Sequence, residues 1–418
     1  MTIQAPTDQT LALTLEGGAT AAIASVRRAT LAERYAADAF VVEWRDFAQL
    51  AAIAGEWREL AANALEPNAF YEPAFALAAA PVFGRGAGAV LVWSASAPRR
   101  LLGFFPARIA TRRYGVRLPV LLGWTHAYAP LGVPLVEREA AEAVIAVWLA
   151  HLAADSELPG VLLLPFLPQD GPFAATLETI LRRTQTPSAD FNRHQRALLA
   201  PGGERAHYVE RALGARRHKE LRRIGRRLAD VGAVLLTSAA EPASVAAAIE
   251  DFFAVEASGW KGKAGTAAAG HEELRRFIRA AAAGLAAEGK IAVDRVLLDG
   301  RTIAAAIILR SGHGAWFWKI AYDEAFARFS PGVMLTVALT DGLIDDPAIV
   351  RADSCATANH PMIDHVWRER LALCDRLIAV RPEAPFIPVR RLERLRSAII
   401  AGAKSMRRRI RGSIARGA

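Results

Sequence analysis

Residues 302–335 read TIAAAIILRSGHGAWFWKIAYDEAFARFSPGVML, and their pattern indicates the class of fold. Two apolar runs, Thr302–Arg310 and Ala315–Ala321, are joined by a short Ser/Gly/His segment, which predicts neighbouring strands. Ser330-Pro331-Gly332 then opens a helix predicted over Pro331–Leu343, because serine is a frequent N-cap and proline suits the first helical position. This order of strand, strand, loop and helix is typical of an α/β protein.

The same order extends outward on both sides and recurs in the first half. Helices are predicted near residues 242–258 and 272–288, with strands at 291–298 and 350–355. The first half has strands at 89–93, 101–109, 119–124 and 161–166, with helices at 40–60, 137–152 and 173–183. The helix from Phe40 is predicted because apolar residues recur there at three- and four-residue steps. We therefore predict an α/β (α+β) chain of two related domains in tandem, each with a mixed central sheet flanked by helices.

Five segments are expected along the chain. They are an irregular lead-in at 1–36, an N-terminal domain at 37–205, a basic connecting helix at 206–230, a C-terminal domain at 231–380 and a basic amphipathic tail at 381–418.

The charge of the chain is concentrated in that tail. The 418 residues include 52 Lys and Arg against 42 Asp and Glu. Between residues 390 and 418, Glu393 is the only acid among ten basic residues: Arg390, Arg391, Arg394, Arg396, Lys404, Arg407, Arg408, Arg409, Arg411 and Arg416. Four apolar residues lie among the arginines: Leu392, Leu395, Ile399 and Ile400. This pattern predicts that the tail is a basic amphipathic helix that binds a membrane surface or an anionic polymer. The alternative is a disordered, solubilising end.

Location is inferred from the two cysteines and from the apolar segments. Cys355 and Cys374 are too few for a disulfide framework, and no basic and apolar leader opens the chain, so a reducing cytoplasm is expected. The longest uncharged stretch, residues 118–136, holds three prolines and two glycines, so no membrane span is predicted. Contact with the inner face of the membrane would come through residues 390–418.

Three motifs could carry chemistry. The helix start at Ser330–Gly332, close to Arg328, is a candidate phosphate site because its first N–H groups are free, although a well-capped helix is the simpler interpretation. The loop Ser258-Gly259-Trp260-Lys261-Gly262 could wrap an anionic ligand, or merely end a helix. Asp353-Ser354-Cys355 leading to His360 and Asp364 suggests a catalytic thiol or a metal, but a buried structural thiol is the better interpretation and no zinc spacing is present.

With these segments placed, the chain resembles the GNAT acyltransferases of the CelD/BcsL (BioF2-like) type, relatives of the FemABX transferases. The resemblance rests on the connecting helix Arg216–Leu228, on the Ser258–Gly262 loop, on Lys319–Asp323, on Ser330–Gly332 and on Asp353 to Trp367. It implies two GNAT-like domains, an acyl-CoA co-substrate, most simply acetyl-CoA, and no metal. Arg328–Gly332 stands where the family usually has a Gln/Arg-x-x-Gly-x-Gly/Ala signature.

The resemblance also implies roles for individual residues. The donor would be bound by Arg328, Ser330, Gly332 and Val333, and the substrate by Trp260, Lys261, Lys319 and His360. Transfer needs a base, oxyanion donors and an acid for the thiolate. Asp323 is expected as the base or as a residue that orients the acceptor, Tyr322 as the acid and Asp353 as a second carboxylate. A capping or turn role is an equally weighted alternative for each of the three.

The expected function is acyl transfer to an amine or hydroxyl of a cell-envelope or polysaccharide precursor, with a small-molecule, glycan or peptide acceptor. Two alternatives stay open. One is an aminoacyl-tRNA-dependent peptidyl transferase, for which tRNA would be the one nucleic-acid partner. The other is a non-enzymatic accessory protein of exopolysaccharide assembly.

Overall fold

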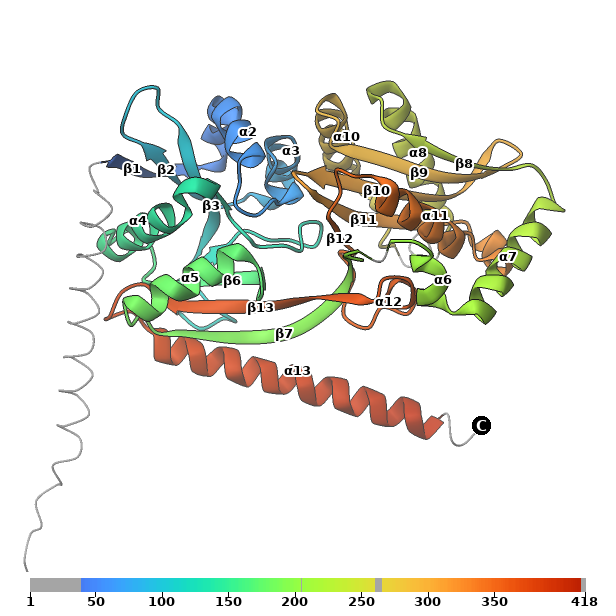
Figure 1. Cartoon of the computed structure of the whole chain (residues 1–418). Coiled ribbons are helices and arrows are strands. Elements are labelled where there is room, and N and C mark those ends of the chain that lie inside the picture. The colour runs from blue at the N-terminus through green and yellow to red at the C-terminus, as the bar shows by residue number, and fades with distance from the viewer. Residues whose placement is uncertain (1–38, 204, 260–264, 415–418) are drawn as a thin grey trace, which may run out of the picture.

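The computed structural model describes residues 39–203, 205–259 and 265–414. Within them one continuous mixed sheet of 13 strands runs through both halves of the chain, with helices on both faces (Figure 1). The strand order is β1-β2-β3-β4-β6-β13-β7-β12-β11-β10-β9-β8, and β5 pairs with β3 off this path. This confirms the predicted α/β fold class with a mixed sheet flanked by helices, and the two sheets expected in tandem are joined into one. The predicted lead-in at 1–36 lies outside the described residues.

The first half of the chain contributes strands β1 to β7 and their helices. The strands are β1 (Phe40–Asp46), β2 (Ala87–Ser94), β3 (Leu101–Ala110), β4 (Val120–Gly123), β5 (Leu135–Val136), β6 (Val161–Pro168) and β7 (Ser188–Leu199). The helical segments are η2 (Phe47–Ile53), α2 (Ala54–Ala62), η3 (Ala69–Tyr71), α3 (Pro73–Phe83), η4 (Arg138–Ala140), α4 (Ala141–Ala154) and α5 (Pro172–Arg183).

The second half contributes the remaining six strands. They are β8 (Val234–Ala239), β9 (Ile291–Leu298), β10 (Arg301–Ser311), β11 (Gly314–Tyr322), β12 (Arg351–Asp353) and β13 (Glu369–Ala379). The helical segments are α6 (Tyr208–Leu213), α7 (Ala215–Ala229), α8 (Pro242–Ser258), η5 (Ala268–Gly270), α10 (Glu272–Ala287), η6 (Glu324–Phe329), α11 (Pro331–Asp345), α12 (Ile363–Val366) and α13 (Phe386–Ile414).

Two sequence-based expectations about the first half need correction. The helix predicted from Phe40 begins with a strand, because β1 pairs antiparallel with β2 from Phe40↔Ser94 to Asp46↔Gly88, and helical structure starts only at Phe47. The predicted domain limits also cut across the sheet. Strand β13, placed by sequence in the C-terminal domain, lies between β6 and β7 of the first half. The last strand therefore ties the two halves together.

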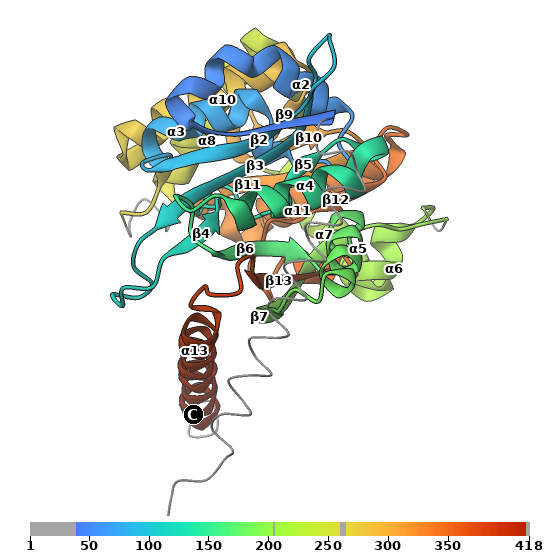
Figure 2. The ribbon, with the colours of Figure 1, turned by 90° about the vertical axis from the view of Figure 1, so that its left-hand side faces the viewer.

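Helices cover the two faces of the sheet because adjacent residues of a strand point to opposite sides. On β3, Phe104 stacks on Trp57 of α2 at a centroid distance of 4.1 Å, while Phe105 stacks on Trp148 of α4 at 4.0 Å. The helices α2, α3, α8 and α10 gather on one side (Figure 2). Gly284 lets α10 approach α3 closely, since a Cβ there would lie 3.0 Å from Cβ of Ala74.

Buried polar contacts reinforce this junction between the halves. The carboxylate of Glu72, at the start of α3, accepts hydrogen bonds from Ser311 Oγ at 2.5 Å and from Lys290 Nζ at 2.8 Å. Glu72 is 1% exposed, so its charge is balanced by a lysine from the other half.

Candidate acyl-donor pocket

The site begins where two parallel strands part. β11 pairs with β12 only from Gly314↔Arg351 to Trp316↔Asp353, and β11 then continues to Tyr322. The chain leaves β12 through Cys355, whose φ of 53° is left-handed. Beyond Trp316 the edge of β11 that faced β12 therefore has no strand beside it in the described residues. Because backbone groups of a strand alternate between its two edges, every second N–H of this segment points into the gap.

A β-bulge shapes β11 at this point. Ile307 pairs with Lys319 and Ile308 with Phe317, so Trp318 is the additional residue of β11. A bulge leaves one residue out of the ladder and re-aims the side chains around it. At this bulge Phe317 packs in the core beneath α11, while Trp318 packs in the aromatic cluster between the halves.

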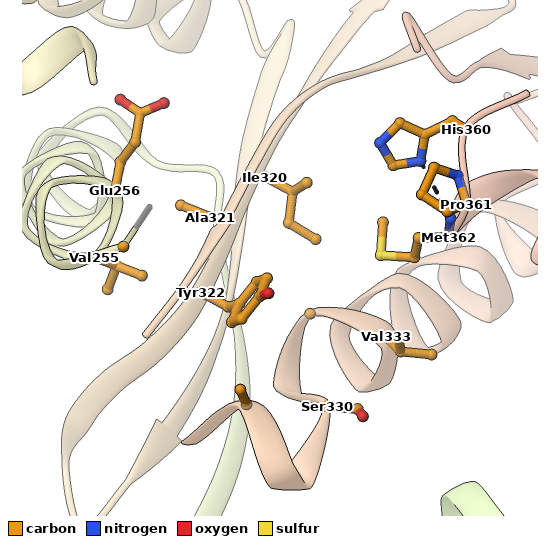
Figure 3. Close-up of a pocket in the computed structure, with 13 residues that line it drawn as sticks. Val255, Glu256, Ile320, Ala321, Tyr322, Ser330, Val333, His360, Pro361 and Met362 are labelled. Atoms are coloured by element: carbon orange, nitrogen blue, oxygen red, sulfur yellow. Dashed lines mark hydrogen bonds between the residues drawn. The ribbon is translucent and has the colours of Figure 1, made fainter. Parts of the chain in front are cut away.

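The gap between β11 and β12 opens into a cavity of about 500 Å³. Its walls come from the end of α8, the free edge of β11, the start of α11 and the loop before α12 (Figure 3). The lining residues are Val255, Glu256, Gly259, Ile320, Ala321, Tyr322, Ala327, Ser330, Gly332, Val333, His360, Pro361 and Met362. The structure thus brings together five residues that the sequence nominated: Tyr322, Ser330, Gly332, Val333 and His360.

The start of α11 supplies fewer donors than its sequence suggests. Pro331 occupies the first helical position as predicted, but Ser330 is left-handed (φ 50°) and its hydroxyl accepts no cap hydrogen bond from the helix. The N–H groups of Val333 and Met334 both donate to the carbonyl of Ser330, at 3.0 and 3.1 Å. Since proline has no N–H, Gly332 offers the open N–H of this first turn within the described residues.

Gly332 is also required sterically. A Cβ on Gly332 would lie 3.2 Å from Cδ1 of Tyr322, so the pocket wall would close on the tyrosine ring. Arg328 does not line the pocket, because its guanidinium stacks on Phe329 at 4.7 Å from the ring centroid. Its expected role in donor binding stays a prediction.

His360 presents a neutral imidazole to the pocket. Burial lowers its pKa, and the nearby Asp364 carboxylate opposes that shift. Nδ1 accepts backbone N–H bonds from Met362 at 3.3 Å and Ile363 at 3.5 Å. An Nδ1 that accepts leaves the proton of the neutral ring on Nε2, so His360 can donate one hydrogen bond.

The two aspartates nominated as catalytic groups lie in structural contacts. Asp323 pairs with Arg301, and its Oδ1 accepts the N–H of Ala325 at 3.0 Å at the start of η6. Asp353 forms a buried ion pair with Arg196, and its Oδ1 accepts the N–H of Cys355 at 3.0 Å. Neither residue lines the pocket. These contacts match the capping and turn roles, and the catalytic assignments stay predictions without support from the geometry.

Sequence reasoning missed Glu256, the carboxylate that does line the pocket. It lies near the end of α8, is 3% exposed, and its Oε2 accepts the N–H of Ala268 at 2.9 Å. Burial raises the pKa of Tyr128 to about 12, and the nearby Glu256 carboxylate adds to this shift. A lone acid in a helix segment that is otherwise uncharged, AVEAS, was the available signal.

Lys319, expected to bind substrate, lies next to Tyr128. Its ammonium lies over the ring of Tyr128 at 3.9 Å from the centroid, a cation–π contact that links the two halves. Trp260 and Lys261, the other expected substrate-binding residues, fall outside the described residues.

The described residues give no support to a catalytic thiol at Cys355 or to a metal site. Burial and the Asp353 carboxylate raise the pKa of Cys355, which keeps the thiol protonated. The described residues contain no cluster of three or more His, Cys, Asp or Glu side chains that could hold a metal ion.

Comparison with known proteins gives a family-model match for this region. Residues 215–354 match the family model of the acetyltransferase (GNAT) domain. This part of the chain is therefore similar to a GNAT domain. It includes α7, α8, the gap between β11 and β12, and the start of α11. None of the curated proteins matches the chain.

Two solved structures have the same fold as most of the chain. A FemX structure superposes with a TM-score of 0.55 and 10% identity, covering 81% of this chain and 98% of that one. The C-terminal domain (DUF2156) of a protein described as a lysylphosphatidylglycerol synthetase, from Agrobacterium fabrum, has a TM-score of 0.50 and 10% identity, covering 79% and 92%. At this identity the similarity establishes the fold alone.

Proposed function

We propose that the protein transfers an acyl group from a thioester donor of the acyl-CoA class, most simply acetyl-CoA, to an amine or hydroxyl of a cell-envelope or polysaccharide precursor. The observation that carries the proposal is the parting of β11 from β12 above a 500 Å³ pocket within the GNAT domain. The CelD/BcsL type of GNAT protein remains the family subtype that the sequence resembles.

The pocket offers a donor thioester several complementary groups. The open N–H of Gly332, at the positive end of the α11 dipole, suits a phosphate oxygen. The free N–H groups on the edge of β11 can donate to the thioester carbonyl, and the same bonds strengthen as charge develops on that oxygen. His360 adds a neutral N–H donor on the opposite wall.

The reaction itself is a direct transfer. The acceptor nitrogen or oxygen attacks the thioester carbonyl carbon, a C–N or C–O bond forms, and the C–S bond breaks. We assign the nucleophile's proton to Glu256, the carboxylate in the pocket wall, and we assign Tyr322 as the hydroxyl that protonates the departing thiolate. Lys319 and Tyr128 stand beside Glu256 as groups for orienting an acceptor that enters between the halves.

One observation favours aminoacyl-tRNA as a second candidate donor. Helix α7 contacts η6, and Gly225 faces Met334 of α11, so the helix flanks the start of α11. Its exposed basic residues are Arg216, Arg217, Lys219, Arg222, Arg223, Arg226 and Arg227. Such a row suits a phosphodiester backbone.

Donor binding and transfer provide the test. Isothermal titration with acetyl-CoA and with CoA should show binding, and Gly332→Val should weaken it at least about tenfold, because the new side chain fills the wall against Tyr322. Gly342→Val on the same helix is the matched control, since no atom lies within 4 Å of its Cβ position.

Transfer of a radiolabelled acetyl group to amino sugars and peptidoglycan precursors then reports the acceptor. Activity that requires charged tRNA and is lost on ribonuclease treatment would assign the FemX-like alternative. Absence of binding to both CoA esters and aminoacyl-tRNA would overturn the enzymatic proposal in favour of an accessory role.

A further inference from the structure

Two segments from distant parts of the sequence meet on one flank of the molecule. The hairpin between β3 and β4 contacts helix α13 through Glu393, whose carboxylate accepts hydrogen bonds from Arg113 Nε at 2.6 Å and from the Tyr114 hydroxyl at 3.1 Å. The guanidinium of Arg396 lies over the Tyr114 ring at 5.1 Å from its centroid. The hairpin and the helix therefore form one surface.

Among the side chains of α13 that the structure describes, those of one side pack on the body. Phe386, Val389 and Glu393 are buried, and Ser397 Oγ lies 3.5 Å from Oδ1 of Asn192 on β7. Figure 1 shows the helix running along β7 and β13 and continuing past them toward the C-terminus. The opposite side of the helix is left to solvent.

That solvent side of α13 is apolar. Leu395, Ile399 and Met406 are 59%, 63% and 66% exposed. At 100° per residue these three positions fall within about 40° of one another, so they form a single stripe. Three long apolar side chains exposed in a row on one helix are typical of a face that meets an apolar phase.

The hairpin presents the same combination of residues. Ile109, Tyr114 and Val116 are 40%, 45% and 48% exposed. Arg108, Arg112 and Arg117 are exposed among them, and residues 108–118 contain no acid. The hairpin, like α13, therefore exposes apolar side chains among arginines.

The charge of the surface has one sign. Within α13 the sequence has nine basic residues and one acid; the basic residues are Arg390, Arg391, Arg394, Arg396, Lys404, Arg407, Arg408, Arg409 and Arg411. The acid, Glu393, is 1% exposed and paired with Arg113, so it does not offset the field outside. No helix in the described part of the chain is long and apolar enough to cross a bilayer.

We propose that residues 108–118 and α13, the docking surface, bind the headgroup region of an anionic lipid membrane, with Leu395, Ile399, Met406, Tyr114 and Val116 entering the interface. Arginines attract an anionic leaflet and apolar side chains gain by leaving water, and the docking surface supplies both together. A nucleic acid would use the arginines but would give the exposed aliphatic residues nothing to enter. This inference goes beyond the proposed function and does not depend on it.

The test is flotation of the full chain with phosphatidylcholine vesicles, with and without phosphatidylglycerol. The wild type should float only with the anionic vesicles, and less so as salt is raised, because salt screens the arginines. The double variant Val116→Glu/Leu395→Glu should lower the partition coefficient at least about tenfold, since it places carboxylates against the anionic surface and removes two apolar contacts.

A matched control separates the effect of placing the new carboxylates on the docking surface from the effect of adding two negative charges to the protein. Val350→Glu/Leu235→Glu makes the same two changes at residues that are 61% and 58% exposed, away from the docking surface. The control should float within about twofold of the wild type, and equal thermal melting of the two variants will establish that both are folded.

Three outcomes would overturn the proposal. They are a wild type that stays with the unbound protein on anionic vesicles, equal losses in the two double variants, and retention on heparin in place of lipid binding. The last result would assign the docking surface to a polyanion.

Discussion

Arg196 on β7 and Asp353 on β12 form an ion pair buried where the two halves of the sheet join. Their side chains are 2% and 7% exposed, and Arg196 also donates to the carbonyl of Pro130 at 2.8 Å. Asp353 pairs with Leu198, next to Ala352 with Leu199, in the short antiparallel ladder between β12 and β7. Immediately after it the chain turns away from β11 and opens the pocket. The Arg196–Asp353 ion pair therefore lies at the point where the gap between β11 and β12 begins, although Asp353 itself does not line the pocket.

Breaking this pair from one side should be costly. Arg196→Met leaves Asp353 as a buried charge without its partner, so we expect the free energy of unfolding to fall by about 3–5 kcal/mol. The double variant Arg196→Met/Asp353→Leu should recover part of that loss, because an apolar pair carries no uncompensated charge. Denaturant unfolding of the three proteins measures both effects. A double variant less stable than Arg196→Met would contradict this account.

Asp323 can be compared with a second aspartate in the same kind of contact. Asp323 accepts the N–H of Ala325 and pairs with Arg301, while Asp346 accepts the N–H of Ala348 and pairs with Arg310. Asp323→Ala and Asp346→Ala should each lower the free energy of unfolding by about 1 kcal/mol, the usual cost of losing a cap.

Turnover distinguishes a structural role of Asp323 from a catalytic one. We expect the two variants to retain similar turnover, since neither carboxylate lines the pocket. A loss of about a hundredfold or more in Asp323→Ala alone would restore Asp323 as the base.

The sequence was most informative where structure is local. The strands and helix between residues 291 and 343 were predicted nearly to the residue, because apolar runs, a Pro at the first helical position and short turns are all local signals. Phe40–Asp46 was misread because its apolar spacing also fits a helix, and only pairing with β2 makes it a strand. β7 and β13 were missed because their stability comes from pairing with each other across 170 residues or more.

The same distinction holds for the pocket. Ser330, Gly332 and Val333 were nominated from one helix start, and they do share a wall. Glu256 joins them only because α8 packs against β11, and Tyr128 approaches Lys319 only because a loop of the first half crosses to the second. Partners of this kind depend on tertiary packing, which no spacing in one sequence encodes.

The two cysteines should be unreactive in the folded protein. Burial raises the pKa of both thiols, that of Cys374 to about 12, and the Asp353 carboxylate adds to the effect at Cys355. Because the thiolate is the reactive form, iodoacetamide at neutral pH should label neither cysteine unless denaturant is present. Mass spectrometry of the labelled protein measures this. Rapid labelling of Cys355 in the native state would reopen a role for its thiol.

His126 should make the protein less stable in mild acid. Its ring stacks on Phe83 at a centroid distance of 4.0 Å, and Nδ1 accepts the N–H of Tyr128 at 3.3 Å. Its Nε2 is buried and has no hydrogen-bond partner among the described residues. Burial lowers the pKa of His126 from 6.5 to about 3. The imidazole is therefore neutral in the folded protein across most of the acidic range.

The sign of the pH dependence follows from which state binds the proton. Between about pH 6.5 and 3 the unfolded chain protonates His126 while the folded chain does not, so stability falls as pH falls through this window, by about 1 kcal/mol between pH 6.5 and 5.5. His126→Phe keeps the stacking on Phe83 and removes the titrating group, so its free energy of unfolding should fall less steeply with acid. His151 and His360, whose pKa values burial also lowers, contribute equally to both proteins, and the difference between the two curves isolates His126. Denaturant unfolding at a series of pH values measures that difference, and parallel curves would show that His126 is protonated alike in the folded and unfolded states.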